Sequence, residues 1–78
     1  GQNIGVELLQ AAEHYCAENA YNSITVETLS PKQNDPNYLK TYRFYEKNGF
    51  KPLFELSPYG PDILMCYMIK SINEIAYD

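Results

Sequence analysis

A helix stop followed at once by a strand is the feature that most constrains how this 78-residue chain folds. The run Tyr45–Phe50 ends in Gly49-Phe50. Glycine adopts the left-handed conformation that closes a helix at little steric cost. A helix should therefore end near Gly49, and residues 50–56 should form a strand. That strand tolerates Pro52 only at a sheet edge or a bulge.

The rest of the chain supplies three further elements and a loop. The apolar residues of segment 4–18 fall on one helical face. Segment 24–29 is rich in β-branched residues and alternates, which indicates a strand. Segment 30–37 is a loop, and an Asx side chain near Asp35–Asn37 can cap the helix that runs to Gly49. The apolar run 63–69 predicts a strand buried on both faces, so the order is α-β-α-β-β and the fold class is α+β.

Composition sets bounds on the function. Seventy-eight residues make one domain at most. The net charge of −4, with six Lys and Arg, argues against a nucleic-acid partner. No stretch approaches the roughly 20 apolar residues of a membrane span and no leader is visible, so no membrane partner and a cytoplasmic location are expected. Cys16 and Cys66 lack metal-ligand spacing, so we expect small buried side chains and no metal.

The N-terminal run Gly1–Gly5 leads straight into a helix and suits an anion. The first amides of a helix are unpaired and lie at the positive end of its dipole, where a phosphate or pyrophosphate can bind. Glycine lets such a ligand approach the backbone closely. Ordinary helix capping explains the same residues equally simply.

Tyr45 carries a phenol that can act as a general acid. Tyr38, Tyr42 and Tyr45 also lie at i, i+4 and i+7 of the second helix. Core packing alone produces that spacing. The sequence therefore leaves two roles open for Tyr45, an acid or a packed core side chain.

Taken together, the two blocks resemble the GNAT superfamily of acetyl-CoA-dependent N-acetyltransferases. Tyr45, Gly49 and Phe50 match its Tyr-x-x-x-Gly-Phe block. The resemblance implies that Tyr45 is the catalytic acid, protonating the departing thiolate of coenzyme A. Gly5 fits the last position of the family's Arg/Gln-x-x-Gly-x-Gly/Ala loop, whereas Asn3 stands where the middle glycine is usual and the leading residue would precede residue 1.

The resemblance also implies a set of coenzyme A contacts and a co-substrate. The family's loop grips the pyrophosphate through backbone amides. Many members place an asparagine on the pantetheine arm seven residues before the tyrosine, a position that is Tyr38 here. Acetyl-CoA is the implied co-substrate, and a small-molecule or peptide amine is the implied acceptor. The implied cofactor-binding residues are Gly1, Gln2, Asn3, Ile4, Gly5 and Val6, with Asn34 and Asn37 as candidates for the pantetheine.

The resemblance implies that residues 1–70 correspond to the C-terminal half of the family's domain, with 71–78 as a tail. The family fold has a mixed sheet. This partial fold would therefore be completed by upstream strands or by a second copy in a homodimer. The isolated piece is expected to be inactive. The alternative is a small non-catalytic α+β module that associates through an exposed strand edge. Glu27 and Glu55 are strand carboxylates that either deprotonate an amine or simply face solvent, and Tyr59 lies in a turn that could border an acceptor.

Overall fold

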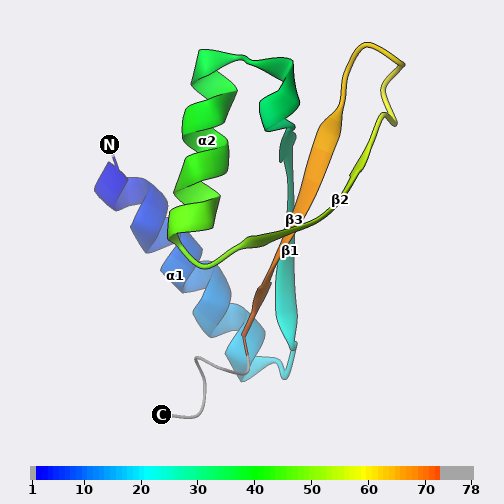
Figure 1. Ribbon diagram of the computed structural model, residues 1–78. Coiled ribbons are helices and arrows are strands. Elements are labelled where there is room, and N and C mark those ends of the chain that lie inside the picture. The colour runs from blue at the N-terminus through cyan, green and yellow to red at the C-terminus, as the bar shows by residue number, and fades with distance from the viewer. Residues whose placement is uncertain (1, 73–78) are drawn as a thin grey trace. The chain divides into compact units, whose positions relative to one another are not determined.

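The computed structural model describes residues 2–72 and has the predicted order of elements. The predicted α+β class and the order α-β-α-β-β are confirmed, with one short 3₁₀ helix added within segment 30–37. Residues 25–70 form one compact unit, and residues 2–24 together with Ser71 and Ile72 belong to a second. In chain order the elements are α1 (Gln2–Glu18), β1 (Ser23–Leu29), η1 (Pro31–Gln33), α2 (Pro36–Lys47), β2 (Lys51–Leu56) and β3 (Met65–Ser71) (Figure 1).

The three strands form an antiparallel sheet in the order β1-β3-β2. Two backbone bonds flank the β1–β3 pair: Ser30 N–H donates to Leu64 O over 2.9 Å, and Ile72 N–H donates to Asn22 O over 2.8 Å. Both place residues opposite one another as antiparallel strands do. The mixed sheet implied by the family resemblance is therefore not present among the described strands.

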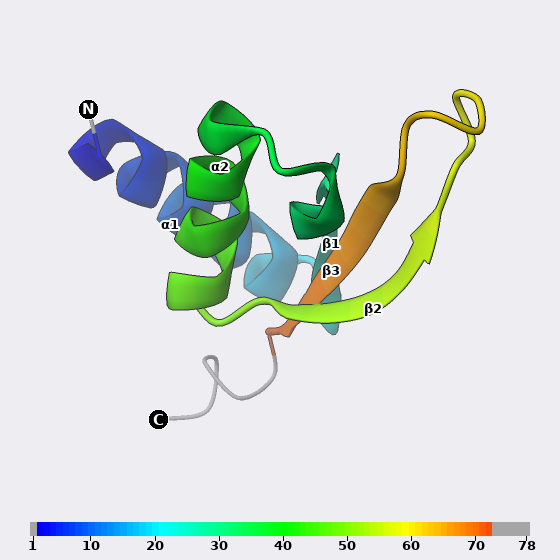
Figure 2. The same ribbon diagram turned by 45° about the horizontal axis from the view of Figure 1, so that its top comes forward.

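Strand β2 lies at an edge of the sheet and carries a bulge. Pro52 pairs with Met68 and Phe54 with Tyr67, so Leu53 has no partner of its own. Proline donates no hydrogen bond to a ladder, and a bulge interrupts pairing and bends the strand. The prediction that Pro52 requires an edge or a bulge is confirmed, because both occur here. Figure 2 shows β2 curving along β3 toward the long connection between them.

Strand β3 is central, but only one of its faces is fully buried. Cys66 is 3% exposed and Met68 is fully buried, whereas Tyr67 and Ile69 are half-buried. The prediction of a strand buried on both faces is therefore wrong for one face. Within residues 25–70 a single α-helix, α2, accompanies the sheet (Figure 2), and one such helix covers one face. The fully buried apolar side chains of this unit are Phe50, Cys66 and Met68.

Helix α2 begins and ends at strong capping signals. At its start, the Asp35 carboxylate accepts hydrogen bonds from the amides of Asn37 and Tyr38. At its end, Gly49 N–H donates to Glu46 O over 3.2 Å and Phe50 N–H to Tyr45 O over 3.0 Å. Gly49 has φ +96°. These two bonds and the positive φ define a Schellman motif.

Helix α1 begins at Gln2, earlier than the predicted Ile4, and ends at Glu18. Leu8 and Tyr15, both expected on its apolar face, are 68% and 61% exposed. Neither α1 nor any other helix among residues 2–72 is long and apolar enough to cross a membrane.

Candidate functional site

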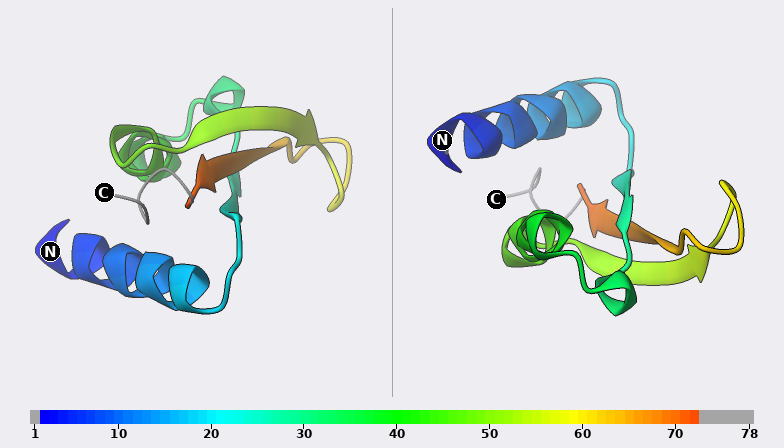
Figure 3. Two further views of the ribbon diagram at one scale, coloured as in Figure 1. Left: turned by 90° about the horizontal axis from the view of Figure 1, so that it is seen from below. Right: turned by 90° about the horizontal axis from the view of Figure 1, so that it is seen from above.

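A hollow of about 440 Å³ lies within residues 25–70, where η1, α2, β2 and β3 meet. We call it the η1–β2 hollow. Figure 3 shows η1 alongside the middle of β2, which brings the two walls together although they are distant in sequence. Its lining is mainly apolar or aromatic, and its only charged groups are one lysine and one glutamate. The lining residues are Pro31, Lys32, Tyr42, Pro52, Leu53, Phe54, Glu55 and Cys66.

Two neighbours hold the Glu55 carboxylate. Ser30 Oγ donates to Oε2, and Lys32 Nζ donates to Oε1 over 2.9 Å. Ser30 is 2% exposed and also caps η1, because its Oγ accepts from the amide of Lys32. The hydrogen bond from Ser30, followed by that from Lys32, lowers the pKa of Glu55 below its usual 4.5. The carboxylate is therefore ionised at neutral pH and anchored from the buried side.

Tyr42 and Cys66 give the hollow its less polar part. Burial raises the pKa of the Cys66 thiol, and the nearby Glu55 carboxylate raises it further. Burial likewise raises the pKa of the Tyr42 phenol, with added contributions from Cys66, Glu46 and Glu55. A thiol with a raised pKa stays protonated at neutral pH and is a poor nucleophile. Cys66 is buried as predicted, whereas Cys16, for which the same was expected, is only half-buried; both are free thiols.

The stabilising contribution of Glu55 to the folded chain should be lost at acid pH. Its pKa is lower in the folded chain than in the unfolded one, so its contribution is complete above the unfolded value and is lost as pH falls through the folded value. We expect the stability gap between the wild type and Glu55→Gln to be full at neutral pH and to close as the pH falls below the ordinary pKa of a glutamate. Urea unfolding across that pH range measures it. Glu46→Gln, which removes an exposed carboxylate from α2 without touching Ser30 or Lys32, should show no comparable closing.

A second polar cluster joins β1, β3 and the β2–β3 connection. Tyr59 and Tyr67 both donate to the Glu27 carboxylate, over 2.8 and 2.5 Å. The bond to Glu27 raises the pKa of Tyr67 to about 12 and also raises that of Tyr59. Glu27 and Tyr59 are therefore engaged with each other. This arrangement ties the connection to the sheet.

The structure places Tyr45 at the C-terminal turn of α2, half-buried. Its ring packs edge-on against Phe50 with centroids 5.3 Å apart, and against Phe44 at 5.6 Å. In a Schellman motif the residue at the place of Phe50 normally makes an apolar contact with the residue at the place of Tyr45. The spacing of Tyr45, Gly49 and Phe50 thus has a complete explanation in helix capping. The Tyr45 hydroxyl makes no hydrogen bond to any of residues 2–72.

The residues expected to bind the pyrophosphate lie at the start of α1. Gln2, Asn3, Ile4 and Gly5 belong to the helix itself and do not form a loop before it, and Val6 follows them. A helix that begins at Gln2 leaves its first backbone amides without intrahelical partners. The first turn holds no acidic residue, so nothing there repels an anion. Gly1 lies outside the described residues.

The two asparagine candidates lie on the connection from η1 to α2. Asn34 ends η1 in the left-handed conformation, with φ 55°, and its amide donates to Pro31 O. Asn37 is in the first turn of α2, where its amide donates to Asp35. Both side chains are exposed. Their backbone amides are thus used by local structure, and only the side chains remain free for a ligand.

Sequence reasoning considered Glu55 but missed its partners Ser30 and Lys32 and the lining residue Tyr42. Lys32 and Glu55 are 23 residues apart, so nothing local connects them. One signal was visible: Ser30-Pro31 after a strand is a capping pattern for a short helix. Finding the ion pair also required the position of β2 beside η1.

Comparisons with known proteins find no match to this chain among family models, curated proteins or solved structures. Among residues 2–72, no group of three or more His, Cys, Asp or Glu side chains is arranged to hold a metal ion.

Proposed function

We propose that this chain is part of an acyl-CoA-dependent N-acyltransferase of the GNAT type, with acetyl-CoA as co-substrate and an amine as acceptor. The observation that carries the proposal is the Tyr45 hydroxyl at the end of α2, which has no hydrogen-bond partner among residues 2–72, within an α-β-α-β-β order of elements. The unpaired first-turn amides of α1 support it as a place for the pyrophosphate.

In the proposed reaction, the acceptor nitrogen bonds to the acetyl carbonyl carbon while the carbon–sulfur bond breaks. Tyr45 gives its phenolic proton to the departing sulfur, and the attacking amine loses its proton to solvent. A proton donor at the leaving group lowers the barrier because it neutralises the developing negative charge.

Tyr45→Phe is the direct test, made in the full-length natural protein. We expect kcat to fall about 100-fold with little change in the KM for acetyl-CoA, because the phenol acts on the leaving group and not on binding. Phenylalanine keeps the ring contact with Phe50, so the helix cap should survive. Tyr21→Phe is the control: it removes a hydroxyl from an exposed tyrosine outside α2 that has no part in the proposed site, and it should leave kcat unchanged. An unaltered rate in Tyr45→Phe would remove this residue from the mechanism.

A non-catalytic interaction module is the second candidate, favoured by exposed apolar side chains around β2. Five of them are at least 40% exposed: Leu53, Phe54, Leu56, Tyr59 and Ile63. Large apolar side chains that cluster at a surface commonly mark a contact with another protein. Calorimetry of the 78-residue chain with coenzyme A separates the candidates, since measurable saturable binding argues against a pure interaction module.

A further inference from the structure

We propose that the η1–β2 hollow binds a small primary amine with an apolar or aromatic body, and that Glu55 receives its ammonium group. The hollow is built entirely from residues 25–70, so the site depends on one compact unit. It requires neither coenzyme A nor Tyr45. The proposal therefore stands or falls separately from acyl transfer.

The size and walls of the hollow suit a small organic molecule. Its volume of about 440 Å³ falls within the roughly 300–1,000 Å³ typical of ligand pockets. Leu53 and Phe54 are 51% and 52% exposed although both are large and apolar. A ligand body lying on them would remove that surface from water. The lining also includes two aromatic side chains, Phe54 and Tyr42, and an ammonium group is attracted to aromatic rings.

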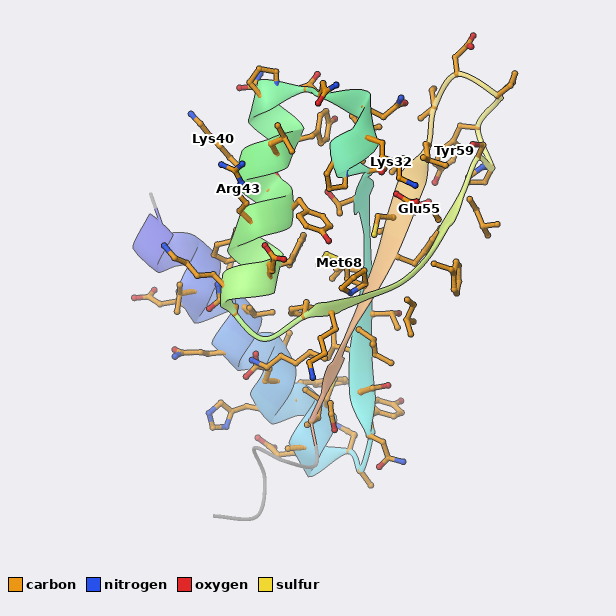
Figure 4. The ribbon with its side chains drawn as sticks, viewed as in Figure 1. Lys32, Lys40, Arg43, Glu55, Tyr59 and Met68 are labelled. Carbon is orange, nitrogen blue, oxygen red and sulfur yellow. The ribbon has the colours of Figure 1, made fainter. Side chains whose placement is uncertain are left out.

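The charges of the hollow select a cation. Glu55 is fixed by Ser30, a buried hydroxyl, and only 28% of its side chain is exposed. Its second partner, Lys32, has 73% of its side chain exposed and is the more accessible to solvent of the pair. Figure 4 shows the side chains of Lys32, from η1, and Glu55, from β2, lying beside each other. A ligand ammonium can replace Lys32 Nζ at Oε1 while Ser30 continues to hold Oε2.

An anionic ligand fits the same hollow poorly. Lys32 is the only cation in the lining, and Glu55 already neutralises it. An incoming carboxylate would meet the Glu55 carboxylate beside it, and like charges at that separation repel. Lys32 thus acts as an internal competitor for the amine and not as a binding group. This reversal of its usual role makes the proposal testable.

The test uses three ligands of one shape with the 78-residue chain: 2-phenylethylamine, the neutral 2-phenylethanol and the anionic 3-phenylpropionate. Calorimetry or NMR titration at neutral pH gives the dissociation constants. We expect the amine to bind at least about tenfold more tightly than the alcohol, as a charge-assisted hydrogen bond provides, and the acid to bind most weakly. Equal binding of amine and alcohol, or no binding of the amine, overturns the proposal.

Three variants locate the site. Glu55→Gln should weaken amine binding about tenfold or more, because it removes the charge that the ligand meets. Lys32→Ala should strengthen it several-fold, because the competitor is gone. Lys40→Ala removes a lysine of α2 that points away from the hollow (Figure 4) and should change nothing. Lys32→Ala exposes no buried group, so it remains informative even if Glu55→Gln is poorly folded, and weaker binding in Lys32→Ala contradicts the proposal.

Discussion

Replacing Phe50 with alanine should lower the free energy of unfolding by about 3–5 kcal/mol. Phe50 is 2% exposed and follows Gly49 at the end of α2, where its amide and its ring both contact Tyr45. Alanine keeps the hydrogen bond from the backbone amide of residue 50 to Tyr45 O but removes the ring. The loss leaves a cavity and a helix end without its apolar contact. Urea or thermal unfolding followed by circular dichroism measures the loss.

Phe54→Ala is the matched control for Phe50→Ala, since it removes the same side chain four residues later at 52% exposure. Its cost should be well below half that of Phe50→Ala, because an exposed ring gives up little buried surface. Phe50→Leu retains most of the apolar volume and keeps the comparison available if Phe50→Ala does not fold. Equal losses for Phe50 and Phe54 would show that the ring of Phe50 is not part of the core.

Met68→Ala should cost about 2–5 kcal/mol, the range for deleting a large buried side chain. Met68 is fully buried at the centre of β3 and lies opposite Pro52 of β2 (Figure 4). Strand β2 offers no ladder hydrogen bond from Pro52 and has a bulge beside it, so side-chain packing contributes more to this pairing than usual. The measurement is the same denaturant unfolding, with the midpoint and slope recorded separately.

Met68→Leu separates the volume of this side chain from its identity. A swap that conserves volume typically costs less than about 1.5 kcal/mol. A large loss with alanine and a small one with leucine would mark Met68 as a packing residue. Comparable losses from both would contradict that assignment.

The sequence predicts the elements of this chain better than it predicts their burial. Periodicity and capping residues are local, so Asp35, Gly49 and the alternating strand 24–29 place the boundaries within a few residues. Burial depends on which face another element covers. The apolar run 63–69 has the same sequence pattern whether one or both faces of the strand are covered. Tyr67 and Ile69 were therefore expected to be buried, and they are only half-buried.

The candidate site was less predictable for the same reason. The sequence identifies Glu55 as a candidate because it is a carboxylate on a predicted strand. Its hydrogen-bond partners, Ser30 and Lys32, come from another part of the chain. The register of β2 against β3 shifts at Leu53, and the alternation expected for an ideal strand does not give the side on which Glu55 lies. Only the folded chain brings these three residues together.

The Schellman turn at Gly49 bears on how short signatures are used to group proteins. A tyrosine, three arbitrary residues, a glycine and a phenylalanine satisfy the backbone bonds and the ring contact of one helix terminus by themselves. Unrelated lineages that need to turn from a helix into a strand can therefore arrive at the same letters through local sterics. Ancestry and shared chemistry are better judged from residues that such a turn does not already dictate.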